Sequence, residues 1–379
     1  MSAPEQARAT LLDVAERAGV SRSTASLAFS GAGPVSEATR ERVMAAASDL
    51  GYGGPDPRAR SLRQGRSGVV GIVFDESLLN AFRDPVNVQT LDGIAEGLGL
   101  DSNGLLLLTE TGAVGTGIQS AAIDAAVLMG CTPVFDRVVD SLGRRGVPIV
   151  SIEGGARDGV VDVGLDNAAA SETLARHLHD LGHRSVGVVT LGTDVSRTIG
   201  LITPEREAGI TAAVTADRLE GVRRVFPDAV AYSAGFNLVD DGVRAGRELF
   251  AAADAAVAAA LPDSPASDAA GGEGATTVLA AHPTAIIAQS DLLAVGVLQV
   301  AAERGLRVPD DLSVTGFDGV RIDGLAGVDL TTMRQPAAEK GRAAGLAVTE
   351  LLAGRPVASA HFECEFHIGD TTGAASTAR

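Results

Sequence analysis

The residues best suited to specific chemistry lie near the start of the chain, where basic and hydroxyl side chains follow a short helical pattern. Residues 11–31 read LLDVAERAGVSRSTASLAFSG, with Gly19 where two helices must cross closely and Ser21 as an N-cap for the second. This pattern is typical of a helix–turn–helix, whose second helix enters the DNA major groove. An arginine there can donate two hydrogen bonds to a guanine edge, and a leucine can contact a thymine methyl. The sequence predicts DNA contacts by Arg22, Ser23, Thr24, Ser26 and Leu27.

A basic segment follows these helices and argues against the alternative of an ordinary small helical bundle. Residues 55–68 read PDPRARSLRQGRSG and contain no acidic residue after Asp56. One leucine, Leu62, lies among arginines, which suits an apolar wedge inserted between base steps in the minor groove. A flexible basic linker is the alternative interpretation. The DNA contacts predicted in this segment are Arg58, Arg60, Leu62 and Arg63.

The charge distribution separates this N-terminal part from the rest of the chain. The 379 residues carry a net charge of −17, but residues 1–66 carry nine Arg against seven acids, so the remaining residues carry −19. An acidic body with a basic N-terminal arm fits a protein that contacts nucleic acid through that arm. Because only two cysteines occur and the first 25 residues hold no apolar signal segment, we expect a cytoplasmic protein. We expect it to associate with the nucleoid when bound to DNA and to have no membrane partner.

From Gly68 onward, short apolar runs alternate with helical stretches. This alternation is typical of a doubly wound α/β architecture with parallel sheets, and its length of about 300 residues favours two similar lobes. Residues 262–275, PDSPASDAAGGEGA, predict a flexible insertion. The expected strands are GVVGIVF (68–74), GLLLLT (104–109), AAVLMG (125–130), VPIVSI (147–152), VGVVTL (186–191), AIIAQS (285–290) and LSVTGFD (312–318).

Polar side chains at the ends of these runs predict a ligand cleft between the lobes. Asp291 ends the run AIIAQSD and can accept hydrogen bonds from two ligand hydroxyls, whereas Arg206 opens the helix PEREAGI and can donate two. Simpler interpretations are that Asp291 caps the helix after it and that Arg206 pairs with a glutamate on its own helix. Phe82 has the alternative role of a core residue. The predicted set is Phe82, Asp84, Glu153, Arg206, Asn237 and Asp291.

The chain resembles the lactose-repressor/galactose-repressor (LacI/GalR) family of bacterial transcription regulators from Thr10 to about Phe366. The motifs that carry the resemblance are LLDVAERAGVS, SEATRERVMAAASDLGY, ARSLRQGRSGVVGIV, LGHR, GLRVPDDLSVTGFD and MRQP. The resemblance implies a small all-α helix–turn–helix headpiece, a hinge helix that folds only on DNA, and a two-lobed core like that of periplasmic binding proteins. The roles it implies are a hinge wedge for Leu62, base reading for Arg22, Ser23 and Leu27, and effector binding for Arg206 and Asp291.

The expected domain boundaries follow from the same comparison. Residues 1–56 form the headpiece and residues 57–67 the hinge. Residues 68–163 with 311–335 are expected to form the N-terminal lobe, and residues 164–310 with 336–366 the C-terminal lobe, which leaves 367–379 as a tail. Two departures from the family pattern, Ala25 in place of valine and Leu27 in place of a polar or basic residue, leave the operator sequence open.

These observations predict a sequence-specific DNA-binding regulator. In particular, we expect a homodimeric repressor that binds an inverted-repeat operator and responds to a small polar effector such as a sugar. A regulator with a ligand-insensitive cleft is one alternative, and a solute-binding protein is a second that residues 1–66 oppose. An enzyme is not expected, because no Ser/His/Asp order, metal-ligand spacing or phosphate-binding loop appears, and no cofactor or metal is expected. The lack of a leucine heptad after Phe366 favours a dimer over a tetramer.

Overall fold

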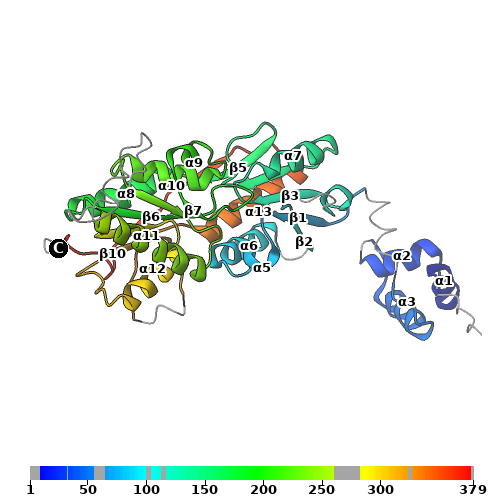
Figure 1. The fold of residues 1–379 in the computed structure, drawn as a ribbon. Coiled ribbons are helices and arrows are strands. Elements are labelled where there is room, and N and C mark those ends of the chain that lie inside the picture. Colours follow the sequence, from blue (N-terminus) through cyan, green and yellow to red (C-terminus); the bar gives the residue numbers. More distant parts are fainter. Residues whose placement is uncertain are drawn as a thin grey trace, which may run out of the picture. The chain divides into compact units, whose positions relative to one another are not determined.

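The computed structural model describes residues 9–31, 33–54, 65–99, 104–111, 117–259, 282–322 and 327–376. The chain divides into two compact units, Met1–Gly68 and Val69–Arg379 (Figure 1). Within the described part of the chain, no helix has the length and apolar character needed to cross a membrane. Predicted features that lie outside the described residues are Arg58, Arg60, Leu62 and Arg63 of the hinge and the insertion 262–275.

The N-terminal unit is a three-helix bundle whose helix starts agree with the predicted capping residues. It contains α1 (Leu11–Ala18), α2 (Arg22–Ser30) and α3 (Glu37–Asp49). The side chains of Thr10, Ser21 and Ser36 each accept a hydrogen bond from the backbone N–H three residues later, which satisfies a donor that the first helical turn leaves unpaired. The buried core of the bundle consists of Val14, Ala15, Ala25, Ala28, Val43, Ala46 and Ala47.

Gly19 is needed for its backbone conformation and not for close helix crossing. Its φ is +66°, in the left-handed region that favours glycine, and a Cβ at this position would meet no atom within 4 Å. The turn lies where the sequence predicts it, but the expectation that a small residue lets the two helices approach closely is wrong.

The second unit contains two sheets, and the first sheet is entirely parallel, with strand order β12-β5-β4-β3-β1-β2. We call this sheet and its helices the N-lobe. Its helices are α5 (Leu78–Ala81), α6 (Pro85–Leu98), α7 (Val134–Arg144) and α13 (Ala337–Leu352), with a 3-10 turn at Gly117–Ser120. Its strands are β1 (Val69–Phe74), β2 (Gly104–Thr109), β3 (Ala125–Met129), β4 (Ile149–Ile152), β5 (Val160–Leu165) and β12 (Ala360–Phe362).

The second sheet has the order β13-β11-β10-β9-β6-β8-β7 and is parallel except at its two edges. We call this sheet and its helices the C-lobe (Figure 1). Its helices are α8 (Asn167–Asp180), α9 (Pro204–Ala208), α10 (Ala213–Arg223), α11 (Val239–Ala259) and α12 (Asp291–Glu303). Its strands are β6 (Val186–Thr190), β7 (Gly200–Leu201), β8 (Val230–Ser233), β9 (Ala285–Ala288), β10 (Ser313–Asp318), β11 (Thr331–Arg334) and β13 (Glu365–His367).

The two late segments of the chain belong to the lobes opposite to those expected. Strands β10 and β11 pair with the C-lobe strand β9, so residues 311–335 are part of the C-lobe. Helix α13 packs on α6, and β12 pairs with β5, so most of 336–366 belongs to the N-lobe. The apolar runs of both lobes look alike, because each is buried on both faces of a parallel sheet, and so their sequence does not reveal which sheet they join.

The C-terminal residues, expected as a tail, are a built part of the C-lobe. Thr371 Oγ1 donates to Val314 O at 2.7 Å, and the backbone N–H of Ala375 donates to Leu181 O at 2.9 Å. His183, expected to be a structural hydrogen bonder, is buried, with its ring nitrogens 2.9 Å from Thr284 Oγ1 and 3.0 Å from Ser313 Oγ. The described residues from Thr371 onward therefore pack against the starts of β10 and β11 and the end of α8.

Glycine sets the spacing between α6 and α13, and we expect its replacement to destabilise the N-lobe. A Cβ on Gly93 would lie 2.0 Å from the carbonyl oxygen of Ala338, which neither helix backbone can avoid without moving. Gly93→Ala is expected to lower the free energy of unfolding by about 2–3 kcal/mol. Gly143→Ala in α7 is the matched control, since a Cβ there meets nothing within 4 Å, and it is expected to raise stability by about 0.5–1 kcal/mol. Equal effects of the two variants in urea unfolding would contradict this account.

Candidate functional site

The headpiece presents the start of α2 to solvent. Ser21 caps this helix, and Arg22 and Ser23 on its first turn are exposed. Leu27 is 38% exposed and packs only partly against the turn at Gly33. Thr24 and Ser26 are half-buried, and Thr24 Oγ1 lies 2.8 Å from Ser21 Oγ, so its hydroxyl also supports the cap. Of the five predicted DNA-contacting residues on α2, Arg22, Ser23 and Leu27 are thus exposed to solvent, whereas Thr24 and Ser26 are only partly so.

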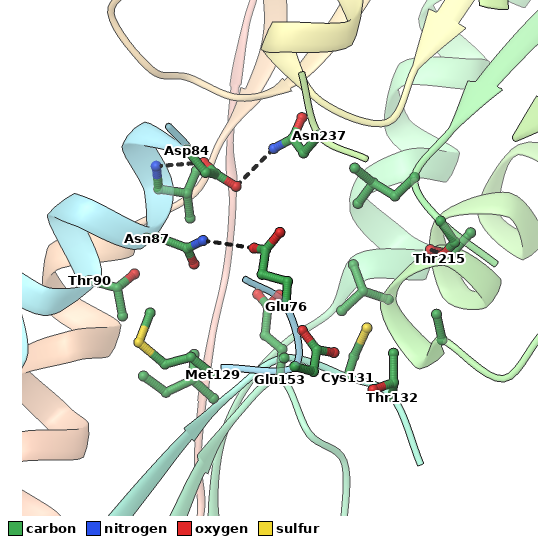
Figure 2. A pocket seen from close by; sticks show the side chains of 18 of the residues that line it. Glu76, Asp84, Asn87, Thr90, Met129, Cys131, Thr132, Glu153, Thr215 and Asn237 are labelled. Carbon is green, nitrogen blue, oxygen red and sulfur yellow. Dashed lines mark hydrogen bonds between the residues drawn. The ribbon is translucent and has the colours of Figure 1, made fainter. Parts of the chain in front are cut away.

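A cavity of about 170 Å³ lies between the two lobes, where the carboxyl ends of strands from both sheets meet (Figure 2). This is the place where open α/β sheets bind ligands. Three of the predicted effector residues line it: Asp84, Glu153 and Asn237. They come from distant parts of the chain, since Asp84 precedes α6, Glu153 follows β4 and Asn237 follows β8.

The other three predicted effector residues do not line this cavity. Phe82 ends α5 and is 50% exposed. Arg206 donates to two backbone carbonyls near its own helix, those of Leu201 and Thr198. Asp291 is buried and accepts from Thr332 Oγ1 at 2.7 Å and from Val320 N–H at 2.8 Å, so it tethers the loop after β10. It is also not the N-cap of α12, a role that Ser290 fills.

Arg218 on α10 lines the cavity, whereas the predicted Arg206 does not. Its side chain is 3% exposed, and its guanidinium stacks on the Phe317 ring with 3.6 Å between the guanidinium carbon and the ring centroid. Nε donates to Asn167 Oδ1 at 2.8 Å, and Nη1 lies 3.6 Å from Asp318 Oδ1. These contacts fix one face and one edge of the guanidinium, as a site must do to present a planar donor to a ligand.

Three ion pairs line the cavity, and each contains one residue with a positive φ. The pairs are Arg197–Asp75 at 3.7 Å, Lys340–Glu153 at 2.6 Å and Arg218–Asp318 at 3.6 Å. Arg197 has φ +51°, Glu153 has φ +56° and Asp318 has φ +122°, and no other described non-glycine residue has a positive φ. Backbone strain of this kind persists where the surrounding structure over-determines a functional geometry. All three described non-glycine residues with a positive φ thus line this cavity.

The cavity carries more acceptors than its cations can neutralise. Burial raises the pKa of Glu76 to about 7, and it also raises the pKa of Asp84. Burial opposes ionisation of Glu153 as well, but Lys340 and Arg218 hold its pKa below the usual value. Among the described residues, no cationic side chain lies within ion-pair distance of Glu76 or Asp84. Both carboxyls accept their hydrogen bonds from neutral donors instead, Glu76 from the Asn87 amide, and Asp84 from the Asn237 amide and the Val86 N–H.

Comparison with known proteins places the chain in a family. Its residues 10–54 match the model for bacterial regulatory proteins of the lacI family, and residues 175–372 match the periplasmic binding protein-like domain. The HTH-type transcriptional regulator IpsA of Corynebacterium glutamicum is 31% identical over 376 residues, which cover 97% of this chain and 98% of that relative. The chain belongs to the LacI family of transcriptional regulators.

Two further similarities extend over most of this LacI-family regulator. The HTH-type transcriptional regulator Rv3575c of Mycobacterium tuberculosis is 34% identical over 359 residues, 91% of either chain. The solved structure of the lac repressor dimer bound to operator and the anti-inducer ONPF has the same fold, with a TM-score of 0.69, 20% identity, and coverage of 97% of this chain and 100% of that one. The LacI-family regulator thus joins a DNA-binding domain to a ligand-binding domain, and its named relatives are regulators.

The sequence of this LacI-family regulator does not by itself distinguish Arg218, which our prediction missed, from Arg206, which it named. Arg206 in REAG and Arg218 in RLEG share the pattern Arg-x-x-Gly. Only the second glycine is required by packing, since a Cβ on Gly221 would lie 2.2 Å from the carbonyl oxygen of Ala168, where α10 crosses α8. The helix that approaches its neighbour so closely is the one whose arginine reaches the cleft.

Proposed function

We propose that this LacI-family regulator is a homodimeric repressor whose affinity for an inverted-repeat operator is controlled by a small polar effector in the cleft between its lobes. The main support for this proposal is the cavity between the lobes, because DNA binding by the headpiece does not by itself require a cavity lined by charged residues. The lac repressor structure, described as a dimer bound to operator and an anti-inducer, supports the same arrangement here. The protein would be cytoplasmic and would associate with the nucleoid when it is bound to DNA.

The effector that suits the cavity is compact and rich in hydrogen-bond donors. The volume of about 170 Å³ fits a molecule the size of one monosaccharide, and none of the residues that line the cavity is aromatic. Without a ring to stack on, a nucleobase or a flat apolar sugar face gains little there. Glu76 would accept hydrogen bonds from hydroxyls, and Asp84 would accept only through the lone pairs that Val86 and Asn237 leave free. Arg218 and Arg197 would donate.

Thermal unfolding with a panel of monosaccharides and polyols tests the effector role. A ligand that binds only the folded core adds about 2.7 kcal/mol of stability at a concentration 100 times its dissociation constant, which raises the melting temperature. A regulator with a ligand-insensitive cleft, the second candidate, would show no shift with any member of the panel. Arg218→Ala should abolish a genuine shift, because it removes the fixed donor in the cavity.

Selection from a randomised duplex pool at about 150 mM salt tests the DNA-binding role, since non-specific phosphate binding is largely suppressed there. We expect an inverted repeat with a flexible pyrimidine–purine step at its centre. We propose direct contacts by Arg22, Ser23 and Leu27, and phosphate contacts by Thr24 and Ser26. If no sequence is enriched with or without candidate effectors, the proposed function is wrong.

Leu62 is proposed as the hinge wedge, with Arg58, Arg60 and Arg63 beside it. Leu62→Ala is expected to lower operator affinity by about tenfold or more, because the kinked central step loses the apolar group that fills it. Affinity for random duplex of the same length should stay within about twofold, since it depends on phosphate contacts. Fluorescence anisotropy with the two duplexes measures both. An equal loss on both would show that Leu62 is not a wedge.

A further inference from the structure

Three side chains form a continuous hydrogen-bonded link between the two lobes. Asn237, in the C-lobe loop between β8 and α11, donates from Nδ2 to Oδ2 of the N-lobe residue Asp84 at 2.8 Å (Figure 2). The Oδ1 atom of the same amide accepts from Ser290 Oγ at 2.5 Å. Both ends of the Asn237 amide thus serve protein partners and hold them in fixed relative positions.

The outer members of this link are the N-caps of two helices in different lobes. Asp84 caps α6 and accepts from Val86 N–H at 2.9 Å through Oδ1, the oxygen that does not face Asn237. Ser290 caps α12 and accepts from Leu293 N–H at 3.1 Å. Each cap bond restrains its side chain, so the Asn237 amide bonds to two side chains that are themselves held by a helix N-terminus.

Separation of the lobes would leave part of this link unpaired. Burial raises the pKa of the Asp84 carboxyl, and the hydrogen bond from Asn237 lowers that pKa by stabilising the ionised form. If the lobes parted, Asp84 would lose that donor, and the Asn237 amide would remain tied to Ser290. Asn87 offers a contrast: its amide faces the same cavity but donates to Glu76 within the N-lobe, at 3.4 Å, and so does not link the lobes.

We propose that Asp84, Asn237 and Ser290 form a latch that holds the lobes closed, so that Asn237 positions the lobes and is not an effector ligand. The proposal rests on the proposed function in one respect, namely that the closed cleft is the effector-bound form. An effector then needs to supply less of the closing free energy itself, and the intact latch raises its apparent affinity.

The distance between the lobes tests the latch directly. Asn237→Asp places a second carboxylate against Asp84 and removes the donor. We expect the ratio of closed to open chains to fall by about 10- to 100-fold, as for loss of a hydrogen bond to a charged group.

Pulsed electron paramagnetic resonance on the full chain measures the distance between the lobes. The spin labels are attached to cysteines introduced by Asp140→Cys in α7 and Glu248→Cys in α11, both at exposed positions. Burial raises the pKa of Cys131 and of Cys364 to about 12, so the native thiols should label slowly.

The reciprocal exchange is the decisive control. Asp84→Asn combined with Asn237→Asp reverses donor and acceptor but keeps both hydrogen bonds and both caps, because Asn caps a helix as well as Asp does. We expect the exchanged pair to restore the parental distance distribution. If Asn237→Asp does not fold, Asn237→Ala, which removes the link without adding a charge, takes its place and should open the lobes.

Two outcomes would overturn the latch: an unchanged distance in Asn237→Asp or Asn237→Ala, or no recovery in the exchanged pair. Neither measurement uses an effector or an operator. If no effector or no operator is found, that result counts against the proposed function, and the distance measurement still tests the latch. Labelled chain diluted with unlabelled chain keeps distances between protomers out of the signal.

Discussion

Arg218→Met should lower the free energy of unfolding of the core by about 3 kcal/mol at neutral pH. Methionine keeps the length and much of the apolar contact with Phe317 but removes the charge that faces Asp318. Asp318 is 6% exposed and would remain as a buried carboxyl without its cation. Arg206→Met is the matched control and is expected to cost no more than about 1 kcal/mol, because Arg206 is half-buried and its side chain donates to the backbone carbonyls of Leu201 and Thr198.

The loss in Arg218→Met should depend on pH with a definite sign. Burial raises the pKa of Asp318 well above its usual value, and Arg218 opposes this increase. Without Arg218 the folded-state pKa of Asp318 rises further. At acid pH the carboxyl is protonated in both proteins and the deficit is smallest, and it grows as the pH rises through the raised pKa of Asp318. Urea unfolding between acid and neutral pH measures the trend, and equal losses for the two arginine variants at every pH would contradict the central role of Arg218.

Arg22→Ala is expected to weaken binding to the selected operator by about 10- to 100-fold and to relax the base preference at one position of each half-site. The reason is the loss of a bidentate contact to guanine, which is worth about 1–3 kcal/mol of discrimination. Arg22 is the first residue of α2 and is exposed, so its loss should leave the headpiece folded. Competition binding with operators changed at single positions gives the preference.

Arg17→Ala provides the control for Arg22→Ala within the same domain. Arg17 lies in the last turn of α1 and pairs with Asp49 at 3.6 Å, with both side chains 62% exposed. Its removal deletes the same charge from the headpiece, so any general loss of phosphate attraction appears in both variants. A base preference that stays unchanged in Arg22→Ala would show that this arginine contacts phosphate and does not read a base.

The headpiece and the cleft differ in how far the sequence predicts them. In the headpiece, the caps at Thr10, Ser21 and Ser36 each bond a backbone N–H three residues away, so the helix starts follow from neighbouring residues. In the cleft, Asp84 meets Asn237, 153 positions further along the chain, and Lys340 meets Glu153 across 187 positions. Nothing local to Lys340, the single lysine of the chain, indicates that it is buried or which carboxylate it meets.

The amino-acid sequence was sufficient for the features that depend on local interactions: the helix–turn–helix, the alternating strands and helices, and the family. Gly19 ends α1 through its own φ, and the run GVVGIVF becomes β1 because it is apolar and bounded by turn residues. Tertiary structure was needed to assign residues 311–335 and 336–366 to their lobes and to select Arg218 over Arg206. Those outcomes depend on which apolar surfaces pack together and which charges become buried, and contacts between residues far apart in the chain decide both.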